Sequence, residues 1–362
     1  MLSQCSCRAP ALHYNRVIAS RDSNREKERG PDESGTTLCC YNIPNQPGIH
    51  RKVREVVDLS IIIVNYNVKH HLGACLQSIY RSTKRASFEI TVVDNNSTDG
   101  SVDTVKSEFP GVKLIENCQN LGFAKANNQA LKENKGRYVL LLNPDTIVLP
   151  NSLDKMVEFM DENPRTGALG CKLLYPDGRL QPSCRSFPTL ITAFFENTGL
   201  EKLFLRNRII GRHRIGHWDY NDIREVDQPM GSALMVRREA ITQVGLMDEQ
   251  FYIYYEDVDW CFRIKKRGWK IYFIPLAQII HYGGQSAWPN MPKMRIQGYK
   301  SRHKFFRKHY GILSEWIVKQ MDLLGLILKT LYRTATLPIN SMRESNRGKV
   351  YSRGSREILK DC

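Results

Sequence analysis

The stretch LSIIIVNYN, residues 59–67, is a short apolar run that stops at polar side chains. Its apolar residues are continuous rather than alternating, which is typical of a strand buried on both faces of a parallel sheet. Similar runs follow in FEITVV, KLIE and YVLLL, and helical patterns lie between them, the first of which carries Leu72, Leu76 and Ile79. The sequence therefore predicts an α/β fold with a mostly parallel central sheet flanked by helices.

Three of these strands end in side chains that can hydrogen-bond or bind a metal. The strand ends are NYN at 65–67, DNNS at 94–97 and NPDT at 143–146. Each one alone is an ordinary turn sequence. In open α/β sheets, however, ligands bind outside the carboxyl ends of the strands, so we expect the three ends to form one polar site. Neither G-x-G-x-x-G nor G-x-x-x-x-G-K-[ST] occurs, which disfavours a common dinucleotide or P-loop site.

The stretch FYIYYEDVDWCFRIKKRG, residues 251–268, places acids beside a run of aromatic residues. On a helix with about 100 degrees per residue, the expected polar face consists of Glu256, Asp259, Arg263, Lys266 and Arg267. Asp259 has an i,i+4 partner in Arg263. Asp257 instead aligns with Cys261 and Ile264 on the inward face. Acids in a first turn can simply complement the helix dipole, but an inward acid requires another explanation.

Further elements are predicted along the second half of the chain. They are a helix at 150–163, a strand at GALGCKLLY, an apolar helix at 188–205, a loop at 206–228, a strand at GSALMV, a helix at 256–267 and a final strand at WKIYFIP. The order of strands and helices continues the α/β pattern of the first half.

Composition limits the class of protein. The chain has 362 residues and a formal net charge of +16, and residues 291–362 hold 16 Lys and Arg but five Asp and Glu. Residues 1–55 lack a hydrophobic period and are expected to form a disordered extension. The ten cysteines are scattered without zinc-ligand spacing, and residues 1–30 contain no apolar segment of the kind found in secretory signals. We therefore expect reduced thiols and a cytoplasmic protein.

Seven segments, in order, carry a resemblance to a known family. They are SIIIVNYN, VVDNNSTDGS, NLGFAKANN, LLLNPDTIV, GSALMVRR, YYEDVDWCFR and IIHYGGQS. This set resembles the family 2 inverting glycosyltransferases of the GT-A fold, and most closely their rhamnosyltransferase-like branch. The resemblance covers residues 58–310. It implies a GT-A nucleotide-diphospho-sugar transferase domain at 56–310, followed by an amphipathic helical segment at 311–338 and a basic disordered tail at 339–362.

The resemblance also implies a site for a nucleoside diphosphate sugar. Tyr66 and Asp94 match residues that contact the nucleobase and ribose, and Asn120, Gly122, Phe123 and Asn127 belong to a segment that closes over the nucleotide. The same nucleotide-sugar site is expected to include the neighbouring residues Asn67, Asn96, Asn143 and Pro144.

A divalent metal site is implied as well. Asp145 matches the last acid of the family's D-x-D motif, and His281 matches a histidine that supplies a further ligand. The first acid of the motif is replaced here by Asn143, so one carboxylate remains. Mg²⁺ is commonly held by one or two carboxylates with waters and substrate phosphates, and an added imidazole also suits Mn²⁺.

Asp257 matches the general base of the inverting transferases. A sugar hydroxyl is a poor nucleophile, so a carboxylate must accept its proton as the new bond forms. Glu256 is the rival candidate. The acceptor or the transferred sugar is expected near Gly231, Ser232, Glu256 and Trp260, because glycine allows close approach of the backbone and aromatic rings suit sugar faces.

The apolar segment ILSEWIVKQMDLLGLILKTL, residues 312–331, is interrupted by charged side chains. It is therefore expected to form an amphipathic helix rather than a membrane-spanning one. Flanking Lys and Arg suit the surface of an anionic membrane, so we expect a peripheral membrane contact. The alternative is a helix packed against the catalytic domain or a second copy. No nucleic-acid-binding module is present, and a nucleic-acid partner is not expected.

The sequence thus predicts an inverting, metal-dependent glycosyltransferase at the cytoplasmic face of the membrane. By resemblance, the donor is dTDP-activated L-rhamnose and the acceptor is a hydroxyl of a glycan or lipid-linked acceptor in cell-surface polysaccharide assembly. The alternatives are a hexosyl or N-acetylhexosaminyl transferase that uses a UDP-sugar, and a catalytically silent sugar-nucleotide-binding protein. Oligomeric state is not predicted.

Overall fold

The computed structural model describes residues 57–199, 218–285 and 291–340. The predicted extension at 1–55 and almost all of the predicted basic tail lie outside these residues. None of the helices in the described ranges is long and apolar enough to cross a membrane.

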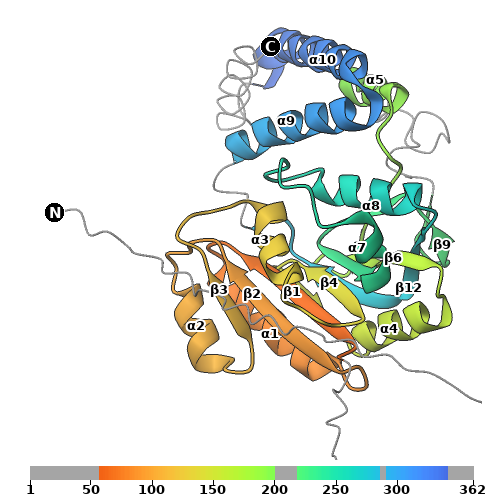
Figure 1. The fold of residues 1–362 in the computed structure, drawn as a ribbon. Coiled ribbons are helices and arrows are strands. Elements are labelled where there is room, and N and C mark those ends of the chain that lie inside the picture. Colours follow the sequence, from red (N-terminus) through yellow and green to blue (C-terminus); the bar gives the residue numbers. More distant parts are fainter. Residues whose placement is uncertain (1–56, 200–217, 286–290, 341–362) are drawn as a thin grey trace, which may run out of the picture. The chain divides into compact units, whose positions relative to one another are not determined.

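The first half of the sheet is a set of parallel strands separated by helices (Figure 1). Its elements are β1 (Leu59–Asn65), α1 (Lys69–Ser82), β2 (Phe88–Asp94), α2 (Ser101–Glu108), β3 (Lys113–Glu116), α3 (Phe123–Leu131) and β4 (Tyr138–Leu142). The strand order is β3-β2-β1-β4. All these strands point the same way, so their carboxyl ends lie along one edge of the sheet, as the sequence predicts.

The second half of the sheet mixes strand directions. Its elements are β5 (Thr146–Val148), α4 (Ser152–Glu162), β6 (Thr166–Leu174), β7 (Leu180–Gln181), β9 (Arg224–Glu225), β11 (Ala233–Arg237), α7 (Arg238–Val244), α8 (Glu256–Lys266) and β12 (Lys270–His281). β11 runs antiparallel to both β4 and β6, whereas β12 runs parallel to β6. The predicted strand WKIYFIP continues through an irregularity to His281, so its last residue lies at the same edge as the ends of β1 and β4.

Both faces of the sheet are covered by helices. Along β1, Ile61 and Ile63 pack into one core with α1, α2 and α4, and Ile62 packs into the other with α3, α7 and α8. These residues are fully buried. Burial on both faces explains why the strands are continuously apolar.

A further group of helices packs against α8 in Figure 1. It consists of α5 (Leu190–Thr198), α9 (Met291–Tyr310) and α10 (Ile312–Asn340). Phe251, Phe305, Phe306 and Val318 form its buried core with Ala193. The predicted helix at 188–205 is observed over the residues of α5, and its remainder falls mainly outside the described ranges.

The prediction that Asp259 lies on an exposed polar face is wrong. Asp259 is fully buried, and its carboxylate contacts Arg263 Nε at 2.8 Å, His309 Nε2 at 2.7 Å and Lys308 Nζ at 2.6 Å. Burial alone would raise the pKa of Asp259, but these contacts lower it to about 2. The predicted Asp259–Arg263 pair is confirmed. The face is buried because α9, which is distant in sequence, packs over it.

Candidate functional site

The ends of β1 and β2 are joined through buried polar side chains. Asn65 and Asp94 are register partners, and Asn65 Nδ2 donates to Asp94 Oδ2 at 2.8 Å. The other carboxylate oxygen of Asp94 accepts from the Ser97 N–H at 2.8 Å. The Asn65 Oδ1 atom is buried and has no hydrogen-bond partner among the described residues. Asp94 is therefore held rigidly at the sheet edge.

Two asparagines beside this pair adopt the left-handed backbone conformation. Asn67 has φ 54° and Asn96 has φ 67°. Asparagine accepts this conformation more readily than most residues. The Asn67 side chain also accepts from the Thr98 N–H at 2.7 Å. The structure thus brings Tyr66, Asn67, Asp94 and Asn96 together in two adjacent loops, as expected for one site.

The entrance to α3 packs tightly against residue 252. Gly122 has φ 82°, and a Cβ at this position would lie 2.4 Å from the Tyr252 carbonyl oxygen, so glycine is required. The Phe123 N–H donates to the same carbonyl at 2.7 Å, and the Tyr252 hydroxyl donates to Asn120 Oδ1 at 3.0 Å. Asn127 Oδ1 is buried in α3 without a hydrogen-bond partner in the described residues. This segment therefore connects the sheet edge to the residues that precede α8.

Asp145 and His281 meet at the ends of neighbouring strands. Asp145 Oδ1 lies 3.4 Å from His281 Nε2, and both side chains are buried. Asn143 Nδ2 lies 3.4 Å from the same ring nitrogen, and Pro144 is the residue between the two motif positions. Burial opposes ionisation of Asp145, but the His281 ring lowers its pKa below the usual range. Asp145 is therefore a carboxylate at neutral pH.

The donor set at this position fits a divalent cation. His281 Nδ1 lies 2.8 Å from Gln181 Oε1, and Gln181 Nε2 points to the His281 carbonyl oxygen at 3.5 Å. The Gln181 contact orients the ring so that Nε2 faces the Asp145 carboxylate. A carboxylate and an imidazole nitrogen that face each other suit Mg²⁺ or Mn²⁺, and a second hydrogen bond that orients the ring is usual for a ligating histidine. No group of three His, Cys, Asp or Glu side chains is arranged for a metal in the described residues, so further ligands would come from the substrate or water.

Asp257 lies at the start of α8 and faces a pocket. Its Oδ2 atom accepts from the Gly231 N–H at 2.8 Å and from Gln228 Nε2 at 3.1 Å. Its Oδ1 atom accepts from the Val258 N–H at 2.8 Å. Burial raises the pKa of Asp257, although these donors and the charge of Arg185 oppose the rise. The carboxylate is thus fixed in position and is a better proton acceptor than an ordinary aspartate.

Glu256 differs from its neighbour in its surroundings. Its side chain is buried, and Oε2 has no hydrogen-bond partner in the part of the chain that the structure describes. Burial, and then the charge of Asp257, raise the pKa of Glu256 well above its usual value. The pKa of Glu256 is therefore raised more strongly than that of Asp257, because Asp257 also accepts hydrogen bonds from the Gly231 and Val258 N–H groups, which oppose the effect of burial. The prediction that Glu256 lies on a polar face of the helix is therefore wrong, because its side chain is buried.

The backbone before these acids is strained. Tyr254 and Tyr255 have φ 64° and 69°, a conformation that is unfavourable for a large side chain. Such strain is typical of functional sites, where the surrounding structure holds a required geometry. The strain is located directly before the residues that carry the acids.

Gly231 and Ser232 connect the pocket to the loop that carries Asn143 and Asp145. A Cβ on Gly231 would lie 3.0 Å from Asp257 Oδ2, so glycine allows this carboxylate to approach the backbone. The Ser232 carbonyl accepts from the Asn143 N–H at 2.9 Å. These contacts place Gly231 beside Asp257 and Ser232 beside Asn143.

Trp260 does not reach the pocket, and its predicted contact with a sugar is wrong. The ring is fully buried in the core beneath the sheet, and Nε1 donates to the Gly245 carbonyl at 3.0 Å. On α8, Trp260 packs into the core together with Cys261 and Ile264.

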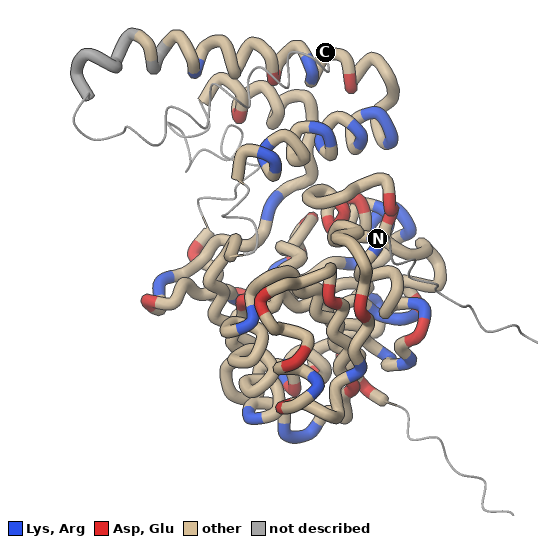
Figure 2. Tube along the Cα trace, turned by 90° about the vertical axis from the view of Figure 1, so that its left-hand side faces the viewer, with Lys and Arg blue, Asp and Glu red and all other residues tan. Residues whose placement is uncertain are grey.

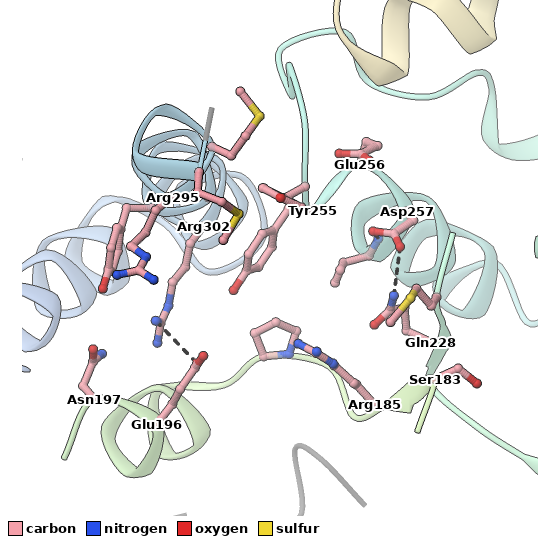
Figure 3. Close-up of a pocket in the computed structure, with 18 of the residues that line it drawn as sticks. Ser183, Arg185, Glu196, Asn197, Gln228, Tyr255, Glu256, Asp257, Arg295 and Arg302 are labelled. Atoms are coloured by element: carbon pink, nitrogen blue, oxygen red, sulfur yellow. Dashed lines mark hydrogen bonds and ion pairs between the residues drawn. The ribbon is translucent and has the colours of Figure 1, made fainter. Parts of the chain in front are cut away.

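The pocket next to Asp257 has a volume of about 570 Å³ (Figure 3). It is lined by residues from six separate segments: Ser183, Arg185 and Pro188; Glu196 and Asn197; Gln228 and Met230; 254–258; Met291, Met294, Arg295, Gly298, Tyr299 and Arg302; and Lys329. Sequence reasoning missed Arg185, Gln228 and Arg302. They belong to none of the seven motifs, and only the fold places them in the same pocket as Asp257.

Comparison with known proteins identifies related chains. A protein-family model described as Glycosyl transferase family 2 matches residues 60–221. The N-acetylglucosaminyl-diphospho-decaprenol L-rhamnosyltransferase of Mycobacterium tuberculosis is 31% identical over 265 residues, which cover 70% of this chain and 85% of that protein. The O-antigen biosynthesis protein RfbC of Myxococcus xanthus is 26% identical over 246 residues, which cover 67% of this chain and 19% of that protein.

A solved structure resembles the fold. The mannosyltransferase PcManGT from Pyrobaculum calidifontis, in complex with GDP-Man and Mn²⁺, aligns with a TM-score of 0.50 and 16% identity over 84% of this chain and 85% of that one. At this identity the likeness concerns the fold alone, and the predicted GT-A arrangement is confirmed.

Proposed function

This chain belongs to glycosyltransferase family 2, and we propose that it transfers L-rhamnose from dTDP-rhamnose, with inversion, to a hydroxyl of a lipid-linked glycan. The glycosyltransferase activity follows from family membership. The choice of rhamnose, and of an acceptor used in cell-surface polysaccharide assembly, is supported by the name of the Mycobacterium tuberculosis relative.

The main support for this proposal is the position of Asp257. This carboxyl group is fixed by the Gly231 N–H and the Gln228 amide at the wall of a pocket large enough for a sugar. In an inverting transfer, the acceptor oxygen bonds to the anomeric carbon from the face opposite the leaving group. Its proton passes to the Asp257 carboxylate, and the nucleoside diphosphate leaves with the electron pair of the broken bond.

The sheet edge supplies the donor site in this proposal. Asp94, fixed by Asn65, accepts hydrogen bonds from the base or ribose, and the buried Asn65 and Asn127 oxygens are further acceptors for the nucleoside. Asp145 and His281, with Asn143 beside them, would hold Mg²⁺ or Mn²⁺. When bound, the cation would neutralise charge on the departing diphosphate.

We also propose that α10 contacts the cytoplasmic face of the membrane. One side of this helix packs on α5 and α9, which agrees with the alternative of a packed helix. The other side exposes a stripe of apolar residues: Leu313, Trp316, Leu324, Ile327, Leu328 and Leu331. Figure 2 shows basic residues along the adjacent α9, which contains no acidic residue in its sequence. An apolar stripe beside basic side chains suits an anionic bilayer, where a lipid-linked acceptor would be found.

The first test is a panel of nucleoside diphosphate sugars in the presence of Mn²⁺ or Mg²⁺. Thermal stabilisation and slow release of nucleoside diphosphate are measured for each donor. We expect dTDP-rhamnose to give the largest stabilisation and a chelator to abolish it. A preference for a UDP-sugar would replace rhamnose by a hexose or N-acetylhexosamine. Binding of no donor with either metal would contradict the enzymatic proposal.

A further inference from the structure

The segment 247–255 links the entrance of α3 to the start of α8. On one side it is held by residues of α3. The Phe123 N–H donates to the Tyr252 carbonyl at 2.7 Å, and Asn128 Nδ2 donates to the Met247 carbonyl at 2.8 Å. Phe123 belongs to the proposed donor site, so the segment is tied to residues that would bind the nucleotide.

The other side of the segment is held by α9. Ser301 Oγ donates to the Ile253 carbonyl at 2.9 Å, and Lys304 Nζ donates to the Gln250 carbonyl at 2.7 Å. Ser301 is 2% exposed, so its hydrogen bond is shielded from water. Because both acceptors are backbone carbonyls, these two bonds fix the path of the chain shortly before α8.

The segment ends in a strained turn that α9 covers. Tyr254 and Tyr255 both have positive φ, and such backbone persists only where the surrounding structure enforces it. A Cβ on Gly298 would lie 3.6 Å from Tyr254 Cδ2, and the ring centroids of Tyr255 and Phe305 are 5.6 Å apart. Gly298 and Phe305 share one face of α9 with Ser301 because the three residues are spaced by one helical turn. This face of α9 therefore enforces the turn.

The strained turn leads directly into the first turn of α8, which carries Asp257. The Asp257 Oδ2 atom accepts from the Gly231 N–H and from Gln228 Nε2. These donors belong to another part of the chain, because Gln228 lies in β10 (Gln228–Pro229), which pairs with β8 (Cys184–Arg185). A shift of the turn would therefore move the carboxyl group relative to its donors and to the pocket.

We propose that Ser301 and Lys304 of α9 are positioning residues for the sugar transfer. By holding the backbone at 250–253, they keep the strained turn in the conformation that places Asp257 at the pocket. Both side chains lie outside the lining of the pocket, and α9 lies outside the residues that the family model matches. The inference rests on the proposed function, in which Asp257 accepts the proton of the acceptor hydroxyl. A small misplacement of such a group slows a reaction strongly.

The test measures kcat and the KM for dTDP-rhamnose, well below the unfolding temperature of each variant. The acceptor is a water-soluble alkyl analogue of the acceptor in the name of the Mycobacterium tuberculosis relative. Ser301→Ala should lower kcat about 10-fold with little change in the KM for the donor, because the contacts to α3 remain. Ser301→Thr keeps a hydroxyl and should restore part of the rate. Lys304→Met alters an exposed side chain and should lower kcat less, and Lys304→Arg should restore it.

Two matched controls remove similar groups from the same group of helices. Ser314→Ala deletes an exposed hydroxyl that donates to the Tyr310 carbonyl at 3.0 Å. Arg307→Met removes a positive charge from α9 at a side chain that is 63% exposed. Both controls should leave kcat unchanged, because neither residue contacts the segment 247–255 among the printed hydrogen bonds and ion pairs of the described chain.

An unchanged kcat in Ser301→Ala and Lys304→Met would overturn the inference while leaving the proposed function intact. An equal loss of kcat in the controls would also overturn it. If Ser301→Ala does not fold, Lys304→Met decides.

If the wild-type enzyme transfers no sugar, the proposed function fails, and crystal structures of the wild type and Lys304→Met decide the inference. A longer distance between Asp257 Oδ2 and the Gly231 nitrogen in the variant supports it, and an equal distance overturns it.

Discussion

The donor edge and the acceptor pocket are built in different ways. The donor edge, defined by residues 65–67, 94–97, 120–127, 143–145 and His281, comes mainly from consecutive strand ends of one sheet. The pocket beside Asp257 instead combines β8, β10, α5, α8, α9 and α10. The first could be recognised from short motifs, whereas the second has no sequence signature. The residues of the proposed donor edge therefore lie in short segments, whereas the residues of the pocket beside Asp257 come together only through long-range packing.

The largest expected effect is on the rate of transfer, after substitution of Asp257 in the pocket. Asp257→Asn keeps the size of the side chain but removes its ability to accept a proton. We expect transfer to fall about 10²- to 10⁴-fold, while donor-induced thermal stabilisation is retained. Asp177→Asn, an exposed acid paired with Arg179, is the control. A loss below about 10-fold would assign the base to another residue.

A substitution at the donor edge should instead affect binding of the donor and the metal. Asp145→Ala removes the carboxylate that faces His281, and we expect metal-dependent donor stabilisation to disappear and turnover to fall about 100-fold. Binding of the acceptor alone, measured by titration, should be unchanged. Asn143→Asp should lower the metal concentration needed for half-maximal activity because it adds a carboxylate. Full activity of Asp145→Ala in a chelator would contradict the metal proposal.

A smaller effect is expected at the junction of the two regions. The added methyl group of Gly231→Ala would lie 3.0 Å from Asp257 Oδ2, so the carboxylate must move by a few tenths of an ångström. We expect kcat to decrease about 10-fold with little change in the KM for the donor. Gly73→Ala, on α1 where the new methyl group meets no atom within 4 Å, should be neutral. An unchanged kcat for Gly231→Ala would show that the position of Asp257 is not critical.

Substitution of Glu256 tests how burial in the pocket affects the stability of the protein at different pH values. The pKa of Glu256 in the folded protein is raised above 4.5. The uncharged side chain therefore contributes fully to stability below that pH, and this contribution is lost as the pH rises. Each unit of the rise corresponds to about 1.4 kcal/mol. Glu256→Gln should therefore unfold at a higher temperature than wild type at pH 8, and the gain should shrink near pH 5. A gain that does not depend on pH would argue against a protonated Glu256.

The smallest effect on catalysis is expected at the exposed stripe of α10. Trp316 is 58% exposed, so Trp316→Glu should not alter folding or turnover of a soluble acceptor. Binding to anionic phospholipid vesicles should weaken about 10-fold, because a buried aromatic contact is lost and a like charge is added. Lys319→Gln, on the same helix, is a milder control. Unchanged vesicle binding would count against the membrane contact.

Much of the donor edge could be predicted because its geometry follows from strand direction. Once 59–65, 88–94 and 138–142 are recognised as parallel strands, Asn65, Asp94 and Asn143 must lie at one edge. The pairing of Asp145 with His281 depended on the family resemblance, since β12 is distant in sequence. The error at Asp259 has a physical cause. A helical wheel assigns faces from polarity, but the actual neighbours of Asp259 are His309 and Lys308 of α9, which compensate its buried charge.

The sequence by itself determined the α/β fold, the position of the polar strand ends and the family. These properties depend on local hydrophobic pattern and on short motifs, which act over a few residues. Only the tertiary structure decided which carboxyl group of the pair at 256–257 receives hydrogen bonds, which side of α10 is exposed and which arginines surround the pocket. Burial, desolvation and charge compensation decide these properties, and they arise only when segments far apart in the chain pack together.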